Sequence, residues 1–137
     1  MTTSDVPESV QQFIFEAIDS VEQLDVLLLL RNKRDRAWSS ASVNAEIRSS
    51  TQSVMNRLIA LEQLGLLVRL MDGSETFRYE PKTSELDAMV AALAEVYRIR
   101  PQKIYELIFS PLKKSRHFAA AFVFKSAVKT KKDSDNG

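Results

Sequence analysis

The sequence predicts a mainly α-helical protein that carries one small β-hairpin and ends in further helices. Three observations support this fold class. Apolar residues recur at helical spacing along most of the chain. Glycine and proline are scarce, at three and four of 137 residues. Two short strand-like segments flank Asp72 and Gly73, a residue pair typical of tight hairpins.

The composition excludes several classes of site. Hydrophobic residues make up 45% and charged residues 27% of the chain, which is typical of a globular protein with a core. The chain has no cysteine, which excludes disulfides and thiolate sites, and its single histidine argues against a transition-metal site. We find no glycine-rich phosphate loop and no nucleophile elbow. We therefore expect a protein that is not an enzyme and needs no metal or cofactor.

The N-terminus and the apolar runs predict a cytoplasmic location. The first five residues are polar and lack the basic-then-apolar order of a signal peptide. The longest apolar run, from Val26 to Leu30, is far too short to span a bilayer.

Two helices are predicted in the N-terminal part of the chain. Pro7 fits the first turn of a helix over about 7–20. A second helix, from residue 21 or 22 to about Asn32, is apolar over most of its circumference, so it should be the buried central helix. The charged stretch from Arg31 to Arg36 then forms a surface connection.

A short helix and a tight polar turn follow this connection. Ser39 or Ser40 can cap a helix that runs to about Arg48. In the polar break after it, Ser49 and Gln52 have the spacing of a capping box that opens the next helix.

That next helix, over about 50–64, is followed at once by the hairpin. Val54, Leu58 and Leu61 form its apolar stripe, and Gly65 is suited to end it. Residues 66–71 and 76–79 then form the two strands of a wing over about 66–80. Two short helices separated by a tight turn and followed by a hairpin make a winged helix-turn-helix.

The sequence around Gly65 resembles that of MarR- and ArsR-type transcriptional regulators. The leucine spacing from Val54 to Leu61, the following Gly65-Leu66-Leu67 and the Asp72-Gly73 wing tip all match the recognition helix and wing of those families. The resemblance covers roughly residues 24–81, less than half of the chain. It implies a winged-helix domain over 1–82 that binds double-stranded DNA, with the helix over about 50–64 in the major groove.

The C-terminal part predicts more helix. Ser84 can cap a helix whose apolar stripe Pro101 interrupts, so that either one helix kinks there or two helices meet. A last helix is expected to run from Ser110 to about Val128. We therefore divide the chain into the winged helix, a helical segment over 83–128 for dimerisation or interaction, and a disordered tail over 129–137. The helix after Ser84 either forms a homodimer, as a palindromic operator demands, or packs on the first helix.

The candidate DNA-binding residues lie on the predicted recognition helix and wing. With Val54 facing inward, Gln52 and Asn56 project outward, and their amides suit bidentate pairing with adenine. Residues at the helix N-terminus suit phosphate, as do the arginines of the wing. The full set is Ser49, Ser50, Thr51, Gln52, Ser53, Asn56, Arg57, Arg69 and Arg78. The plainer interpretation is that these are ordinary polar residues on a solvated helix.

The distribution of charge keeps a second function open. From Trp38 to Pro81 there are four arginines and five acidic residues, a poor balance for a phosphate-binding surface. Residues 111–132, in contrast, hold seven basic residues and no acid. The alternative function is therefore a winged-helix adaptor that engages an acidic protein or a membrane surface through Lys113–Lys132. That segment can equally dock its phenylalanines on the core and expose its lysines to water.

Overall fold

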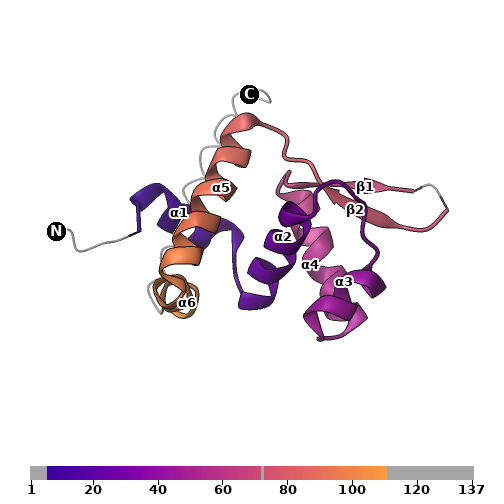
Figure 1. Ribbon diagram of the computed structural model, residues 1–137, viewed down its shortest axis with the longest axis horizontal. Helices are drawn as coiled ribbons and strands as arrows, with labels where there is room; N and C mark the ends of the chain where they lie inside the picture. The colour runs from indigo at the N-terminus through magenta and orange to yellow at the C-terminus, as the bar shows by residue number, and fades with distance from the viewer. Residues whose placement is uncertain (1–5, 72, 111–137) are drawn as a thin grey trace, which may run out of the picture.

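The computed structural model describes residues 6–71 and 73–110, which form six helices and a two-stranded antiparallel sheet (Figure 1). The elements are α1 (Glu8–Ala17), α2 (Val21–Asn32), α3 (Ser40–Ile47), α4 (Thr51–Gln63), β1 (Leu67–Leu70), β2 (Thr76–Tyr79), α5 (Ser84–Ile99) and α6 (Pro101–Phe109). Among these residues no helix has both the length and the apolar character needed to cross a membrane. The last predicted helix and the tail lie outside the described residues.

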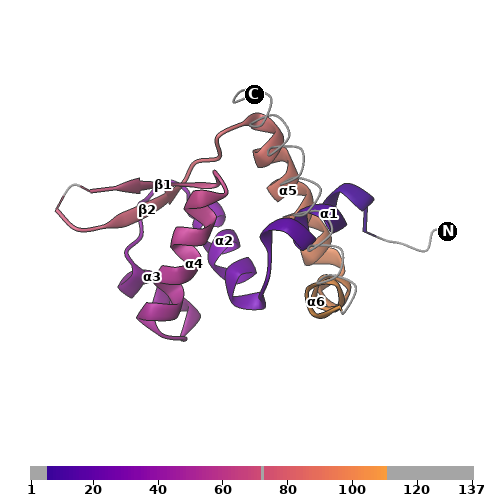
Figure 2. The same ribbon diagram turned by 180° about the vertical axis from the view of Figure 1, so that it is seen from behind.

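The second helix is the centre of the molecule. It packs against α3, α4 and β2 on one side, while α1 packs against α5 and α6 on the other (Figure 1). The view from behind shows the same arrangement, with the hairpin extending away from the α1–α5–α6 side (Figure 2). One continuous hydrophobic cluster joins the two sides. Leu24, Leu27 and Leu30 are fully buried in it, which confirms α2 as the central buried helix.

The boundary between α1 and α2 differs from the expectation. The first helix ends at Ala17 rather than near residue 20, because Ile18 takes an extended conformation. Ser20 is then free to cap α2, and its hydroxyl accepts the backbone N–H of Gln23 at 3.0 Å.

The start of α4 differs from the predicted start. Ser50, not Ser49, is the N-cap residue, and its hydroxyl accepts the backbone N–H of Ser53 at 3.0 Å. The shift arises because Arg48 adopts the left-handed conformation, with a φ of 64°, and so lengthens the turn. The backbone N–H of Ser49 instead donates to Asn44 Oδ1 at 2.7 Å. The capping box predicted for Ser49 and Gln52 is therefore wrong.

The end of α4 is a Schellman motif, as the glycine predicted. Gly65 has a φ of +84° and donates its N–H to the carbonyl of Glu62 at 2.9 Å. The N–H of Leu66 bonds to the carbonyl of Leu61 at 3.1 Å. These bonds turn the chain sharply from α4 into β1.

The hairpin pairs Leu67 with Tyr79 at its base and Leu70 with Thr76 near its tip. A feature that the sequence did not reveal is the bridge between Trp38 and Phe77. Their backbones exchange hydrogen bonds of 2.7 and 2.8 Å and form an isolated β-bridge beside the two-stranded sheet. Trp38 and Phe77 are both buried, and the hairpin is thereby fastened to the helical core.

The chain around Pro101 forms two helices and not one kinked helix. Two helices meet there, with Pro101 in the first turn of α6 and Arg100 in a non-helical conformation between them. The cap of α5 is Thr83 rather than Ser84, since the Thr83 hydroxyl accepts the N–H of Leu86 at 3.1 Å.

Gly65→Ala should lower the free energy of unfolding by about 1–2 kcal/mol, because a side chain disfavours the left-handed conformation. Gly65→Asn is the matched variant, since asparagine tolerates this conformation better. Both place a Cβ 3.0 Å from Lys82 Cδ, so the contact is common to the two. Urea denaturation should show the smaller loss for asparagine. Equal losses would mean that the contact, not the backbone, sets the cost.

Candidate nucleic-acid interface

The fourth helix has a sharply divided surface. Its inner residues Val54, Leu58 and Leu61 have no exposed surface, whereas Gln52 and Asn56 on the opposite side are exposed. The Gln52 amide nitrogen donates to the Asn56 side-chain oxygen at 3.2 Å. No other element of the described residues covers these two amides. They are therefore free to meet an outside partner while the inner face holds the helix on the core.

The N-terminus of α4 offers hydroxyls and backbone N–H groups. Ser49, Ser50 and Thr51 are exposed. The Ser50 hydroxyl is occupied as the helix cap, and the Ser49 hydroxyl donates to Glu22 Oε1 at 3.1 Å. Thr51 begins the helix, where the positive end of the helix dipole favours a negatively charged group.

Three of the candidate residues face back toward the junction of α1 and α2. Glu22 accepts the Ser49 hydroxyl and also the Ser53 hydroxyl, the latter at 2.6 Å. The Arg57 guanidinium lies 3.8 Å from Glu22 and 3.2 Å from Asp19. These carboxylates hold the N-terminal half of α4 against the α1–α2 junction. Ser53 and Arg57 are therefore positioning residues in this structure.

Glu22 and Asp19 were not among the residues predicted to belong to the site. Glu22 follows the Ser20 cap, where an acidic side chain is common because it favours the helix dipole. Nothing in the local pattern indicates that its carboxylate reaches a helix 31 residues further along the chain.

The two wing arginines lie on opposite faces of the hairpin. Arg69 pairs across the strands with Phe77, whereas Arg78 pairs with Val68 one position further along. Arg69 faces α4, with its guanidinium 5.0 Å from the centre of the Phe77 ring. It binds Glu62 at 2.6 Å and also Glu75, and the hydrogen bond to Glu62 is the main reason that the pKa of Arg69 is raised.

Each arginine of the predicted site thus has a carboxylate partner. Arg78 lies 3.2 Å from Glu80, and this pair is well exposed. Exposed ion pairs are worth little, so a phosphate can replace Glu80 at small cost. Arg57 and Arg69 each hold two carboxylates, and phosphate must compete with both.

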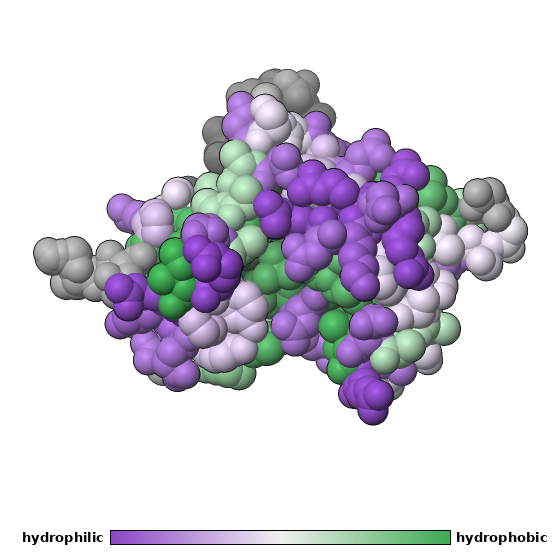
Figure 3. All heavy atoms as spheres, viewed as in Figure 1, coloured by the Kyte–Doolittle hydropathy of each residue, from purple (hydrophilic) through white to green (hydrophobic). Residues whose placement is uncertain are grey.

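The basic segment from Arg31 to Arg36, which was predicted as a surface connection, lies beside the hairpin. Arg34 stacks over the Tyr79 ring, with 5.0 Å to its centroid, and Arg36 stacks over Trp38 at 3.8 Å. The Tyr79 hydroxyl donates to Asp87 at 2.8 Å. Burial, together with this hydrogen bond, raises the pKa of Tyr79. Figure 3 shows hydrophilic residues gathered on the face over the end of α2 and this connection.

Comparison with known proteins identifies the fold. No protein-family model matches the sequence, and no curated protein is similar to it. The chain is similar to MepR of Staphylococcus aureus, a transcription regulator of the multidrug efflux pump MepA, at 17% identity and a TM-score of 0.52, over 88% of each chain. A MepR mutant bound to an oligodeoxyribonucleotide matches at 16% identity and a TM-score of 0.53, again over 88% of each chain.

This likeness confirms the predicted fold: the chain has the winged-helix fold of MepR, with six helices and the hairpin among its described residues. The resemblance to MarR-type regulators is confirmed at the level of the fold, because MepR is a MarR-family protein. The matched protein MepR is a transcription regulator.

The Glu22 contacts predict a loss of stability when this carboxylate is removed. Glu22→Ala should lower the free energy of unfolding by about 1–3 kcal/mol, because hydrogen bonds to a charged group are stronger than neutral ones. Glu8→Ala is the control, since Glu8 is also in a first helical turn but is exposed. Urea denaturation measures both changes. Equal losses would show that helix-dipole effects alone account for Glu22.

Proposed function

We propose that the protein is a DNA-binding transcriptional regulator of the cytoplasm, with α4 in the major groove and the hairpin on the flanking backbone. The observation that carries the proposal is the exposed pair Gln52 and Asn56 on a helix whose opposite face is anchored in the core. A MepR mutant with the same fold binds an oligodeoxyribonucleotide, which supports DNA as the partner.

The chemistry of the outer face fits base recognition. An asparagine or glutamine amide can accept from and donate to the edge of adenine at the same time. The hydrogen bond between Gln52 and Asn56 limits the freedom of both side chains before DNA arrives, so less conformational entropy is lost on binding. In this proposal Ser50 and Thr51 at the helix N-terminus and Arg78 on the wing contact the phosphates.

A homodimer belongs to the same proposal. A palindromic operator needs two recognition helices related by symmetry. Large apolar side chains are exposed at the ends of α5 and α6, where Ile99 is 56% and Phe109 72% exposed. Burying these side chains against a second copy is favourable. The contact surface would lie well away from α4.

The second candidate function is a winged-helix adaptor that binds protein. It is favoured by the pairing of Arg57, Arg69 and Arg78 with carboxylates, which lowers the attraction of this face for phosphate. Its proposed partner surface, Lys113–Lys132, lies outside the described residues. The adaptor predicts that deletion of residues 111–137 abolishes partner capture.

The regulator predicts a loss of DNA affinity in two α4 variants. Gln52→Ala and Asn56→Ala should each weaken binding to a duplex selected from a random library by about tenfold or more, because a bidentate amide–base pair is worth about 1–3 kcal/mol. Fluorescence anisotropy measures the dissociation constant. The thermal unfolding midpoint should not change, since both side chains are exposed.

Gln102→Ala and Asn32→Ala are the matched controls for these variants, since both residues are exposed and lie on other helices. They should bind the duplex like the unaltered protein. Failure to select any duplex at low salt would refute the regulator, and so would equal affinity of the α4 variants and the controls.

The dimer predicts a change of mass in solution. Phe109→Glu should convert a dimer to a monomer in sedimentation velocity, because it places a charge in the proposed contact. Met71→Glu is the matched control, as Met71 is equally exposed at 72% but lies beside the hairpin. A dimer that survives Phe109→Glu, or a chain that is monomeric throughout, would remove the contact at α6 from the account.

A further inference from the structure

Arg57 lies on the flank of α4 that faces the junction of α1 and α2, one residue after the exposed Asn56. Its Nη1 donates to Asp19 Oδ1 at 3.2 Å, and its Nε lies 3.8 Å from Glu22 Oε2. A helix with its side chains is about 10–12 Å across, so it fills a major groove that is about 12 Å wide. In the proposed complex the flanks of α4 therefore face the phosphates that border the groove.

The two carboxylates that hold Arg57 differ in their surroundings. The Glu22 side chain is 21% exposed and also accepts the hydroxyls of Ser49 and Ser53, so it is part of what holds α4 in place. The Asp19 side chain is 64% exposed, and Arg57 is its one ion-pair partner among the described residues. An exposed pair of this kind is worth little. Asp19 is therefore the carboxylate that a phosphate can replace, while Glu22 keeps the Nε end of the guanidinium in place.

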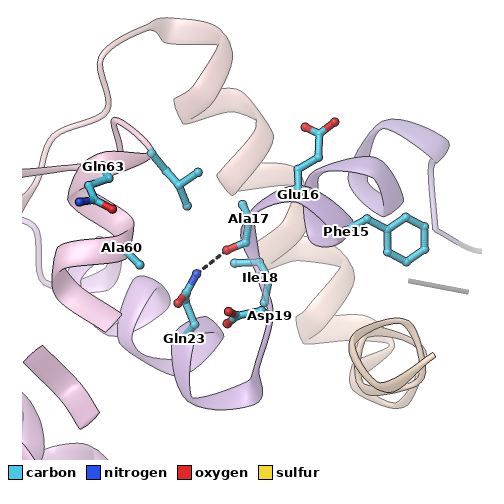
Figure 4. Close-up of a pocket in the computed structure, with 9 residues that line it drawn as sticks. Phe15, Glu16, Ala17, Ile18, Asp19, Gln23, Ala60 and Gln63 are labelled. Atoms are coloured by element: carbon cyan, nitrogen blue, oxygen red, sulfur yellow. Dashed lines mark hydrogen bonds between the residues drawn. The ribbon is translucent and has the colours of Figure 1, made fainter. Parts of the chain in front are cut away.

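The space beside Asp19 leaves room for this exchange. Figure 4 shows Asp19 on the connection between α1 and α2, with Ala60 and Gln63 of α4 on the other side of a pocket. The pocket has a volume of about 250 Å³ and opens to solvent. The Asp19 carboxylate thus stays hydrated when the arginine leaves it, and the exchange buries no unpaired charge.

We propose that Asp19 is an exchangeable counter-ion that competes with DNA phosphate for Arg57 and so limits the affinity of the protein for any duplex. In the free protein the carboxylate occupies Nη1 of Arg57. In the complex a phosphate takes that position, and Asp19 turns to solvent. Because a phosphate contact carries no sequence information, the effect is the same for every duplex. This inference rests on the proposed function, since it needs a duplex against the flank of α4.

Asp19→Asn removes the charge and keeps the shape of the side chain. In fluorescence anisotropy the variant should bind both the selected duplex and an unrelated duplex of equal length about threefold to tenfold more tightly. The logarithm of the binding constant should also fall more steeply with the logarithm of the salt concentration, by about 0.9 in slope. The reason is that each phosphate neutralised releases a cation, whereas in the unaltered protein the freed Asp19 takes a cation up again. The thermal unfolding midpoint should change little, because Asp19 is exposed.

Glu95→Gln is the matched control. It removes the same charge from another exposed ion pair, in which Glu95 lies 2.6 Å from Arg98 on α5. It should leave the affinity and the salt slope unchanged. Arg57→Ala supplies the second comparison, because Asp19→Asn should give no gain in a protein that already lacks the arginine.

The inference is overturned if Asp19→Asn binds both duplexes like the unaltered protein, or if Glu95→Gln gains as much. It is also overturned if the gain persists in the Arg57→Ala background, since Asp19 would then act by general repulsion. A gain confined to the selected duplex contradicts it too, because it would place Asp19 among the base contacts. If neither the unaltered protein nor the variant binds any duplex, the proposed function itself fails, and this inference fails with it.

Discussion

The structure depends on how α4 is held. Its stripe of Val54, Leu58 and Leu61 is fully buried against the core, and burial of side chains of this size is worth about 1.5–3 kcal/mol each. Glu22 adds polar bonds to Ser49 and Ser53, and the turn at Gly65 sends the chain directly into the hairpin. Because every one of these attachments is made from the inner side or the ends, the face with Gln52 and Asn56 stays open. The position of the wing relative to α4 follows from the same constraint.

Compensated charge is the second property of this surface. The arginines next to the proposed groove contact are bound to carboxylates of α4, the hairpin or the α1–α2 junction. Such pairing gives a surface with little excess positive charge, and non-specific affinity for DNA comes mostly from phosphate neutralisation. Sequence recognition by this protein would then rest on base contacts of α4 more than on attraction to the backbone. That division favours high specificity at modest affinity.

Much of the fold could be predicted from the sequence, because helical periodicity, caps and the Asp72–Gly73 pair are local signals. The outward direction of Gln52 and Asn56 follows from the same periodicity. The polar contacts of α4 with the α1–α2 junction could not be predicted, since the hydrogen bond from Ser53 to Glu22 and the ion pair of Arg57 with Asp19 span 31 and 38 residues of chain. The left-handed Arg48 moved the α4 cap by one residue, and the single bridge of Trp38 to Phe77 is too short to leave an alternating pattern.

The central claim is that the open face of α4 makes the contact with DNA. The side-chain amide signals of Gln52 and Asn56 in nitrogen-15 NMR spectra test it most directly, when recorded with and without a duplex selected by the protein. The account predicts that both signals shift on binding, while the side-chain amide of Gln23, buried on the other side of the helix, does not. Tight binding of duplex that leaves the Gln52 and Asn56 amides unchanged would contradict the account.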